Sequence, residues 1–174
     1  MHANPPVSDS LLDCLSDECN SLLVIRIRGG VKASRDELAT LKMLNLTRAN
    51  RATIIPKTPS FIGMLKKVEH YITWGEPNLK TVKTFLRRIE LLGGGRIDGE
   101  FLKRLGFDSL DQLAEKIYKG ELALNKLKDK GVRPYVRLHP PKGGFKGTIK
   151  KHVSVGGEYG YRGERINELF VRMT

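Results

Sequence analysis

The sequence predicts an α+β fold built on a small antiparallel sheet. Three segments of strand character alternate with two helical segments between residues 22 and 74. Elements spaced this closely are typical of one compact unit, so we expect the strands to form a single sheet with both helices covering one of its faces. From residue 77 onward the chain is mainly helical and contains one extended, basic, glycine-rich loop.

The three expected strands are short. They cover residues 22–28, 51–56 and 70–74. In the first of them isoleucines alternate with Arg26 and Arg28, and this period of two predicts a half-buried strand with one basic face. The spacing of the elements does not determine the order of the strands in the sheet.

Both helices of this unit have start signals in the sequence. Ser34 stands three residues before Glu37, which is the spacing of a capping box. Thr58 precedes Pro59, and this pair favours a helix start because threonine caps the free amides and proline fits the first turn. Apolar residues recur three or four positions apart after both starts, as on the buried face of a helix.

The second half of the chain has a different pattern. We expect helices at 79–92, 101–105, 109–118 and 163–173, one or two helical turns at 121–128, and a strand at 132–138. The chain therefore divides into three expected parts: an acidic, disordered leader at 1–20, the α+β core at 21–76, and a helical lobe with the basic loop and the closing helix at 77–174.

The charge of the chain is strongly basic and unevenly distributed. There are 31 Lys and Arg against 19 Asp and Glu, and residues 1–20 hold four of the acids and none of the bases. A body this basic favours RNA, DNA or an anionic membrane face as partner. Because no apolar run approaches the ~20 residues of a membrane span and no signal peptide is recognisable, we expect a cytosolic protein without a membrane partner.

Residues 134–151, PYVRLHPPKGGFKGTIKK, form the most basic stretch. The segment contains no acid, and its basic residues are Arg137, Lys142, Lys146, Lys150 and Lys151. Alone it would be a mobile loop, because it buries little apolar surface and its charges repel one another. A polyanion would order it, since Lys and Arg neutralise phosphates and glycine lets the backbone approach closely. A solvated surface loop is the alternative reading, and the basic charge of the whole chain favours nucleic acid over it.

Catalytic and metal motifs are not recognisable in the sequence. The four histidines are scattered, and Cys14 and Cys19 would need two further ligands with only His2 nearby. No serine lies in a nucleophile motif and no pair of acids stands in an apolar context. We therefore expect no metal, no cofactor and no enzymatic activity, and an RNA-modifying enzyme would have no candidate nucleophile.

Two further patterns have alternative readings. The glycines at 156–163 precede the closing helix, whose start with Arg162 and Arg165 could bind phosphate or could be a plain turn and cap. The helical segments at 109–131 could form a helix-turn-helix, which would indicate a DNA-binding protein. An ordinary helical hairpin is favoured there, because Asn125 is the only amide in the second segment that could read base edges.

Several motifs in order resemble one protein family. They are TPSFIGML at 58–65, WGEPNL at 74–79, and the tail PKGGFKGTIKKHVSVGGEYGYRGERINELFVRM. Together with the segment from Leu22 they are similar to the large-subunit ribosomal protein family numbered thirty, over residues 21–174. The long basic N-terminal arm of eukaryotic members is absent from this chain, which indicates the archaeal type. The acidic leader matches no part of the family pattern.

The resemblance implies a ferredoxin-like core and a structural role in the large ribosomal subunit. Its partners would be large-subunit ribosomal RNA and neighbouring ribosomal proteins, and whether the small (5S) ribosomal RNA takes part stays open. Contacts would rest on phosphate and shape rather than on base stacking, because aromatic residues are few. In a three-stranded sheet, the basic residues near the first strand and the start of the second helix could cluster at one end. The candidate RNA-contacting residues are Arg26, Arg28, Lys32, Arg35, Lys57, Thr58, Ser60, Arg137, Lys142, Lys146, Lys150, Lys151, His152, Arg162 and Arg165.

Overall fold

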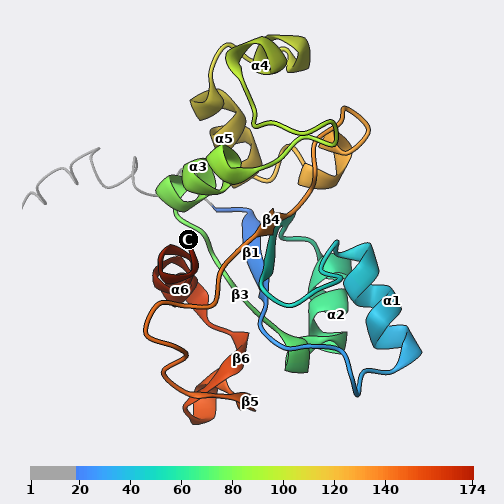
Figure 1. Ribbon diagram of the computed structural model, residues 1–174, viewed down its shortest axis with the longest axis vertical. Helices are drawn as coiled ribbons and strands as arrows, with labels where there is room; N and C mark the ends of the chain where they lie inside the picture. Colours follow the sequence, from blue (N-terminus) through green and yellow to red (C-terminus); the bar gives the residue numbers. More distant parts are fainter. Residues whose placement is uncertain (1–18) are drawn as a thin grey trace, which may run out of the picture.

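The computed structural model describes residues 19–174 and has a mixed α/β fold around one six-stranded sheet (Figure 1). The strands are β1 (Ser21–Arg26), β2 (Arg51–Pro56), β3 (Ile72–Gly75), β4 (Val136–Arg137), β5 (Thr148–His152) and β6 (Gly157–Tyr161). The helices are α1 (Arg35–Met43), α2 (Pro59–Lys67), α3 (Leu79–Arg88), α4 (Gly99–Leu105), α5 (Leu110–Tyr118) and α6 (Ile166–Met173). Short 3-10 turns are η3 (Glu69–Tyr71), η4 (Leu124–Leu127), η5 (Val153–Val155) and η6 (Gly163–Arg165).

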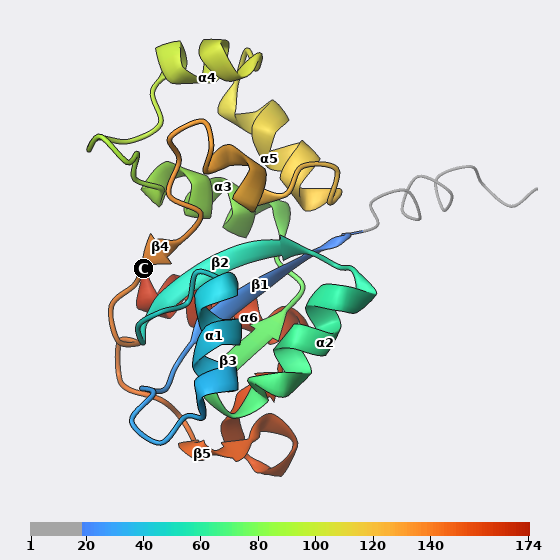
Figure 2. The ribbon, with the colours of Figure 1, turned by 90° about the vertical axis from the view of Figure 1, so that its right-hand side faces the viewer.

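The strand–helix–strand–helix–strand order expected between residues 22 and 74 is present. Strand β1 lies at the centre and pairs antiparallel with β2 on one side and β3 on the other. Helices α1 and α2 lie together on one face of these strands (Figure 2). The leader residues 1–18, and with them the expectation of disorder there, lie outside the described residues.

The sheet is larger than expected and is not wholly antiparallel. Its order is β4-β2-β1-β3-β6-β5, and both β3–β6 and β6–β5 are parallel pairs. Edge strand β4 lies within the strand expected at 132–138, whereas the other edge strand, β5, begins in the basic segment expected as an extended loop. The strands form because backbone groups at the edges of β2 and β6 offer hydrogen bonds, while Phe145 and Ile149 pack against the core.

Strand β1 is buried on both faces, so the expected half-exposed strand with a basic face is wrong. Leu22 and Val24 belong to the apolar cluster under α1 and α2, whereas Leu23 and Ile25 belong to the cluster under the C-terminal helices. This second layer was not foreseen, because residues far along the chain form it. This layer packs helices from the part of the chain after residue 76 against the sheet of the expected core. The division into a core at 21–76 and a lobe at 77–174 stays a prediction.

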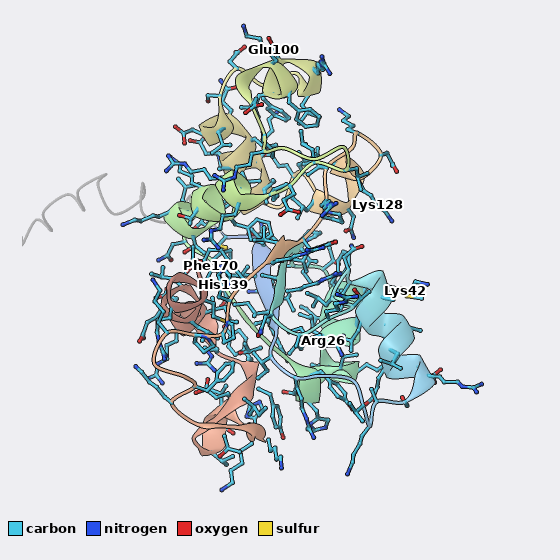
Figure 3. The ribbon with its side chains drawn as sticks, in the orientation of Figure 1. Arg26, Lys42, Glu100, Lys128, His139 and Phe170 are labelled. Carbon is cyan, nitrogen blue, oxygen red and sulfur yellow. The ribbon has the colours of Figure 1, made fainter. Side chains whose placement is uncertain are left out.

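The second layer packs α3 against α6. Phe85 of α3 and Phe170 of α6 are both fully buried, with ring centroids 6.1 Å apart. Figure 3 labels Phe170 where the two helices meet. Apolar residues at helical spacing in both segments predicted these helices, although α3 ends at Arg88 rather than 92, because the next residues turn outward into short bridges with Arg96 and Val132.

Arg26 lies inside the protein and is only 2% exposed. Its Nε donates to the Arg28 carbonyl at 2.9 Å, and its Nη1 donates to the buried Leu46 carbonyl at 2.7 Å. Burial lowers the pKa of Arg26 below its ordinary value. The side chain therefore links the end of β1 to the turn after α1 and does not face solvent.

The helix starts agree with the sequence. Ser34 and Glu37 form the complete capping box, with Ser34 N–H donating to the Glu37 carboxylate at 2.7 Å. Thr58 Oγ1 accepts from the amide of Phe61. Among the described residues no helix is long and apolar enough to span a bilayer.

Replacing Arg26 with Met should lower the free energy of unfolding by ~1–3 kcal/mol, because the buried Leu46 carbonyl loses its donor. Denaturant unfolding of the full chain measures this. The matched control is Arg87→Met on the exposed face of α3, which should change stability little. Equal stability of the two variants would show that the internal hydrogen bonds of Arg26 contribute nothing to the free energy of unfolding.

Candidate nucleic-acid interface

The register of β1 and β2 separates two groups of candidate residues that were expected to cluster. Ser21 lies opposite Pro56, so Lys57 follows β2 at the start of β1, where its amide donates to the Asn20 carbonyl. Arg28 follows the opposite end of β1. A six-residue strand is about 17 Å long, so the antiparallel pairing places the two groups at opposite ends of the sheet. The expectation of one cluster is wrong.

The group after β1 comprises Arg28, Lys32 and Arg35. Lys32 and Arg35 are exposed, and the Arg28 guanidinium lies 5.9 Å from the centre of the Tyr71 ring. A shallow depression of about 250 Å³ lies beside them and is bordered by the fully exposed Val31. These cations project from the loop that joins β1 to α1, so a polyanion can reach them.

At the other end of the sheet, Lys57 forms an ion pair with Glu76 at 3.4 Å. Thr58 caps α2 and is half-buried, and Ser60 is exposed in its first turn. Glu76 also accepts a hydrogen bond from the Tyr161 hydroxyl at 2.8 Å, which raises the pKa of Tyr161 to about 12. The positive charge of Lys57 is thus partly neutralised within the protein.

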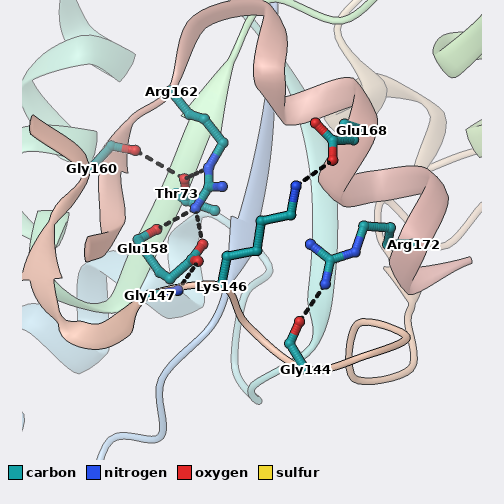
Figure 4. A network of polar contacts seen from close by, with 9 residues as sticks. All are labelled: Thr73, Gly144, Lys146, Gly147, Glu158, Gly160, Arg162, Glu168 and Arg172. Carbon is teal, nitrogen blue, oxygen red and sulfur yellow. Dashed lines mark hydrogen bonds and ion pairs between the residues drawn. The ribbon is translucent and has the colours of Figure 1, made fainter. Parts of the chain in front are cut away.

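The basic tail presents four exposed lysines. Lys142 precedes the glycine turn, and Lys150 and Lys151 lie on the edge strand β5. Lys146 is different, because its Nζ lies 3.0 Å from Glu168 of α6 (Figure 4). That hydrogen bond, followed by the charge of Lys146, holds the pKa of Glu168 below its usual value.

Arg162 does not lie on an open surface. Its guanidinium is paired with Glu158 and donates through Nε to Thr73 Oγ1 at 3.3 Å (Figure 4). Glu158 in turn accepts from the Gly147 amide at 2.7 Å. The group ties β3, β6 and the end of the basic segment together, so the structure favours a structural role for Arg162 over a phosphate contact. Arg165, the other candidate beside the closing helix, is exposed.

His152 is half-buried and joins β5 to η3. Its Nε2 lies 3.0 Å from Glu69 Oε1, and its Nδ1 accepts from the Ser154 amide at 3.1 Å. Both ring nitrogens therefore have partners within the protein, and the side chain holds β5 in place.

The helix-turn-helix alternative lacks its second helix. After α5 and a turn at Lys119 and Gly120, the chain forms only the four-residue 3-10 turn η4. Leu124 and Leu127 of this turn are buried in the core. An element of one turn with its apolar residues inward cannot lie in a major groove as a recognition helix.

Metal binding has no support in the part of the chain that the structure describes. No group of three His, Cys, Asp or Glu is close enough there to hold an ion. Cys14 lies outside the described residues. Cys19 donates from Sγ to the carbonyls of Ser21 and Pro77 and helps to attach the start of β1.

Three arginines that the sequence reading missed lie at the edge formed by β2 and β4. Arg51 of β2 is directly opposite Arg137 of β4, and Arg48 and Arg133 are close enough to affect the pKa of Arg51. The signal in the sequence was the pair of arginines in the polar turn before β2. It could not be combined with Arg137, because the strand expected at 132–138 carries no sign of which strand it pairs with.

Comparison with known proteins gives consistent results. A family model described as ribosomal protein L30p/L7e matches residues 22–72. A large ribosomal subunit protein uL30 from Metallosphaera sedula is 42% identical over 89% of this chain and 99% of its own length. Proteins of the same name from Methanococcus vannielii and Saccharolobus islandicus are 44% and 41% identical, over 86% of this chain and 97% and 96% of theirs.

Replacing Gly157 with Ala should destabilise the β5–β6 edge, because a Cβ at this position would overlap the backbone carbonyl of Lys151. We expect a lower melting temperature and faster amide exchange in β5 than in the wild type. Gly29→Ala is the matched control, since nothing lies within 4 Å of a Cβ there. Unchanged exchange in β5 of the Gly157 variant would contradict the close packing of these strands.

Proposed function

This chain belongs to the ribosomal protein L30p/L7e family, and from that premise we propose that it is a structural constituent of the large ribosomal subunit that binds and stabilises large-subunit ribosomal RNA. The observation that carries the proposal is identity above 40% to uL30 proteins over almost their whole length. The basic charge of the body and the exposed cations at both ends of the sheet agree with a polyanionic partner.

We propose two principal surfaces for the RNA. One is the loop after β1, with Arg28, Lys32 and Arg35. The other is the basic tail, with Lys142, Lys150, Lys151 and Arg165. Arg28 is half-buried and the other cations are exposed; they lie on different elements, so they would neutralise separate phosphates and release counterions. Lys57 and Ser60 would form a weaker contact at the far end of β1, because Glu76 competes for Lys57.

The basic tail is preorganised for binding, unlike a free loop. Strand β5 holds Lys150 and Lys151 on the edge of the sheet, and Lys146 is held on α6 by Glu168. Less conformational entropy is then lost when RNA binds. RNA could also displace the exposed Glu168 from Lys146, since an ion pair in water stabilises the protein little.

The wider arrangement belongs to the same proposal. A ferredoxin-like core at 21–76 and the lobe at 77–174 would span neighbouring RNA helices and hold them together. The 5S ribosomal RNA and adjacent ribosomal proteins are further proposed partners. The proposed role is non-catalytic, in keeping with a family of ribosomal proteins.

Sucrose-gradient fractionation of native cell extract at increasing salt tests the assignment. Probed in the fractions, the chain should sediment with the large subunit and leave it only at high salt, because several phosphate contacts must be broken. A chain that stays at the top of the gradient at moderate salt, or that sediments with DNA, would exclude the ribosomal role.

Reversing two charges on β5 tests the tail surface. Lys150→Glu with Lys151→Glu should weaken binding to deproteinised large-subunit ribosomal RNA at least about tenfold, or ~1.4 kcal/mol. Filter binding at a fixed salt concentration measures this. The control is Lys66→Glu with Lys67→Glu on α2, which makes the same change in net charge at another exposed pair. An equal loss in both variants would mean that only the overall field matters and that β5 makes no local contact.

A further inference from the structure

The edge of the sheet at β2 and β4 forms a basic depression, the arginine notch, defined by Arg48, Arg51 and Arg137. Antiparallel pairing places Arg51 directly opposite Arg137. Side chains at such positions start about 5 Å apart. The depression has a volume of about 210 Å³, and its remaining lining residues are Ala49, Asn50 and Leu138.

The turn that carries Arg48 is fixed in position. Asn50 adopts a left-handed conformation with a φ of 58°, its amide donates to the Arg26 carbonyl at 2.7 Å, and its own carbonyl accepts from Leu138 at 2.8 Å. The turn is therefore hydrogen-bonded to residues from β1 and from the chain after β4. Arg26 is itself held by internal hydrogen bonds, so the notch has a rigid base.

Arg51 is oriented before any ligand arrives. Its guanidinium lies 4.2 Å from the centre of the Tyr135 ring, and Nη1 donates to Thr47 Oγ1. The ring contact and the hydrogen bond favour this orientation of the side chain. A guanidinium held in this way loses less entropy on binding, and its remaining N–H groups keep the planar arrangement that suits phosphate oxygens.

The charge of the notch is not balanced from within. None of the residues that line it is acidic. Arg133, which is also close, is paired with Glu90 at 2.7 Å. Burial, and then the charges of Arg137, Arg48 and Arg133, lower the pKa of Arg51, while the neighbouring Tyr135 acts in the opposite direction. Positive charges brought together in this way repel one another, and an anion between them would relieve the repulsion.

We propose that the arginine notch is a binding site for phosphodiester groups of an RNA backbone. This rests on the proposed ribosomal function and adds to it a site whose residues differ from those of the loop after β1 and of strand β5. Arg51 and Arg137 would hold one phosphate between two strands, and Arg48 would contact the same phosphate or the next. Such a contact positions the RNA without reading its sequence.

RNA fits the notch better than a protein partner does. Three arginines line a shallow depression together with a small exposed residue, Ala49, so a narrow backbone can approach them closely. The notch lacks an apolar surface of the kind that anchors a protein interface, because Leu138, its only large apolar lining residue, is 7% exposed.

The salt dependence of RNA binding tests the site. Arg48, Arg51 and Arg137 are changed together to Gln in the full chain, and binding to deproteinised large-subunit ribosomal RNA is measured from low to high salt. The slope of log K against log salt should fall in magnitude by about 1–2, as one or two phosphate contacts are lost. The control changes Arg87, Arg96 and Arg104, three exposed arginines of the lobe, to Gln, and its slope should change by less.

Circular dichroism and thermal unfolding check that each variant is folded. If the triple variant unfolds, Arg48→Gln with Arg137→Gln replaces it, because this pair leaves the stack of Arg51 on Tyr135 intact. The slope should then still fall by about 1.

Two results would overturn the site. One is an equal change of slope in the notch and control variants, which would mean that the net charge of the protein, and not the notch itself, determines the salt dependence. The other is unchanged binding to naked RNA together with poorer incorporation into subunits, which would assign the notch to a protein neighbour. In both cases co-sedimentation of the wild-type chain with the large subunit would leave the ribosomal function standing.

Discussion

The rest of the structure depends on the burial of one strand, β1, on both of its faces. Its odd and even residues enter two separate apolar clusters, one under α1 and α2 and one under α3 and α6. Because a short strand is buried on both sides, each neighbouring element is positioned relative to it. The same burial encloses Arg26, whose guanidinium must then find acceptors inside the protein.

This constraint also determines where the exposed cations lie. Antiparallel pairing of β1 with β2 places the loop before α1 and the start of α2 at opposite ends of the sheet. The same pairing continues to β4 and brings Arg137 beside Arg51. The basic residues therefore form separate groups around the rim, and an RNA that touches several of them must contact more than one edge of the molecule.

Local features were predictable from the sequence because local forces produce them. The capping box at Ser34, the start of α2 at Thr58 and the strand at 51–56 are all present where they were expected. The resemblance to the ribosomal family was also readable, since its motifs stand in order along the chain.

Features that depend on distant partners were not predictable. Arg26 was assigned to a basic surface because alternation with isoleucine does not show which face of the strand α1 and α2 cover. Arg26 lies on that covered face with Leu22 and Val24, and the isoleucines face the second layer of helices. The inward position of Arg162 depends on Glu158 and Thr73, which parallel pairing of β6 with β3 brings near. Strand β4 lies within the strand expected at 132–138, but its pairing with β2 has no sign in the sequence, so the grouping of the three arginines in the notch could not be predicted.

The parallel pairing of β6 with β3 has a consequence for synthesis of the protein. Strand β3 ends at Gly75, whereas β6, the strand that covers its open edge, begins only at Gly157. Until the residues from Gly157 onward leave the ribosome that makes them, β3 presents unpaired backbone groups and the apolar face of the sheet lacks α6. Uncovered sheet edges pair readily with other chains. Nascent or truncated copies that lack β6 and α6 would therefore be prone to aggregate, because β6 closes the edge of the sheet and α6 covers its face.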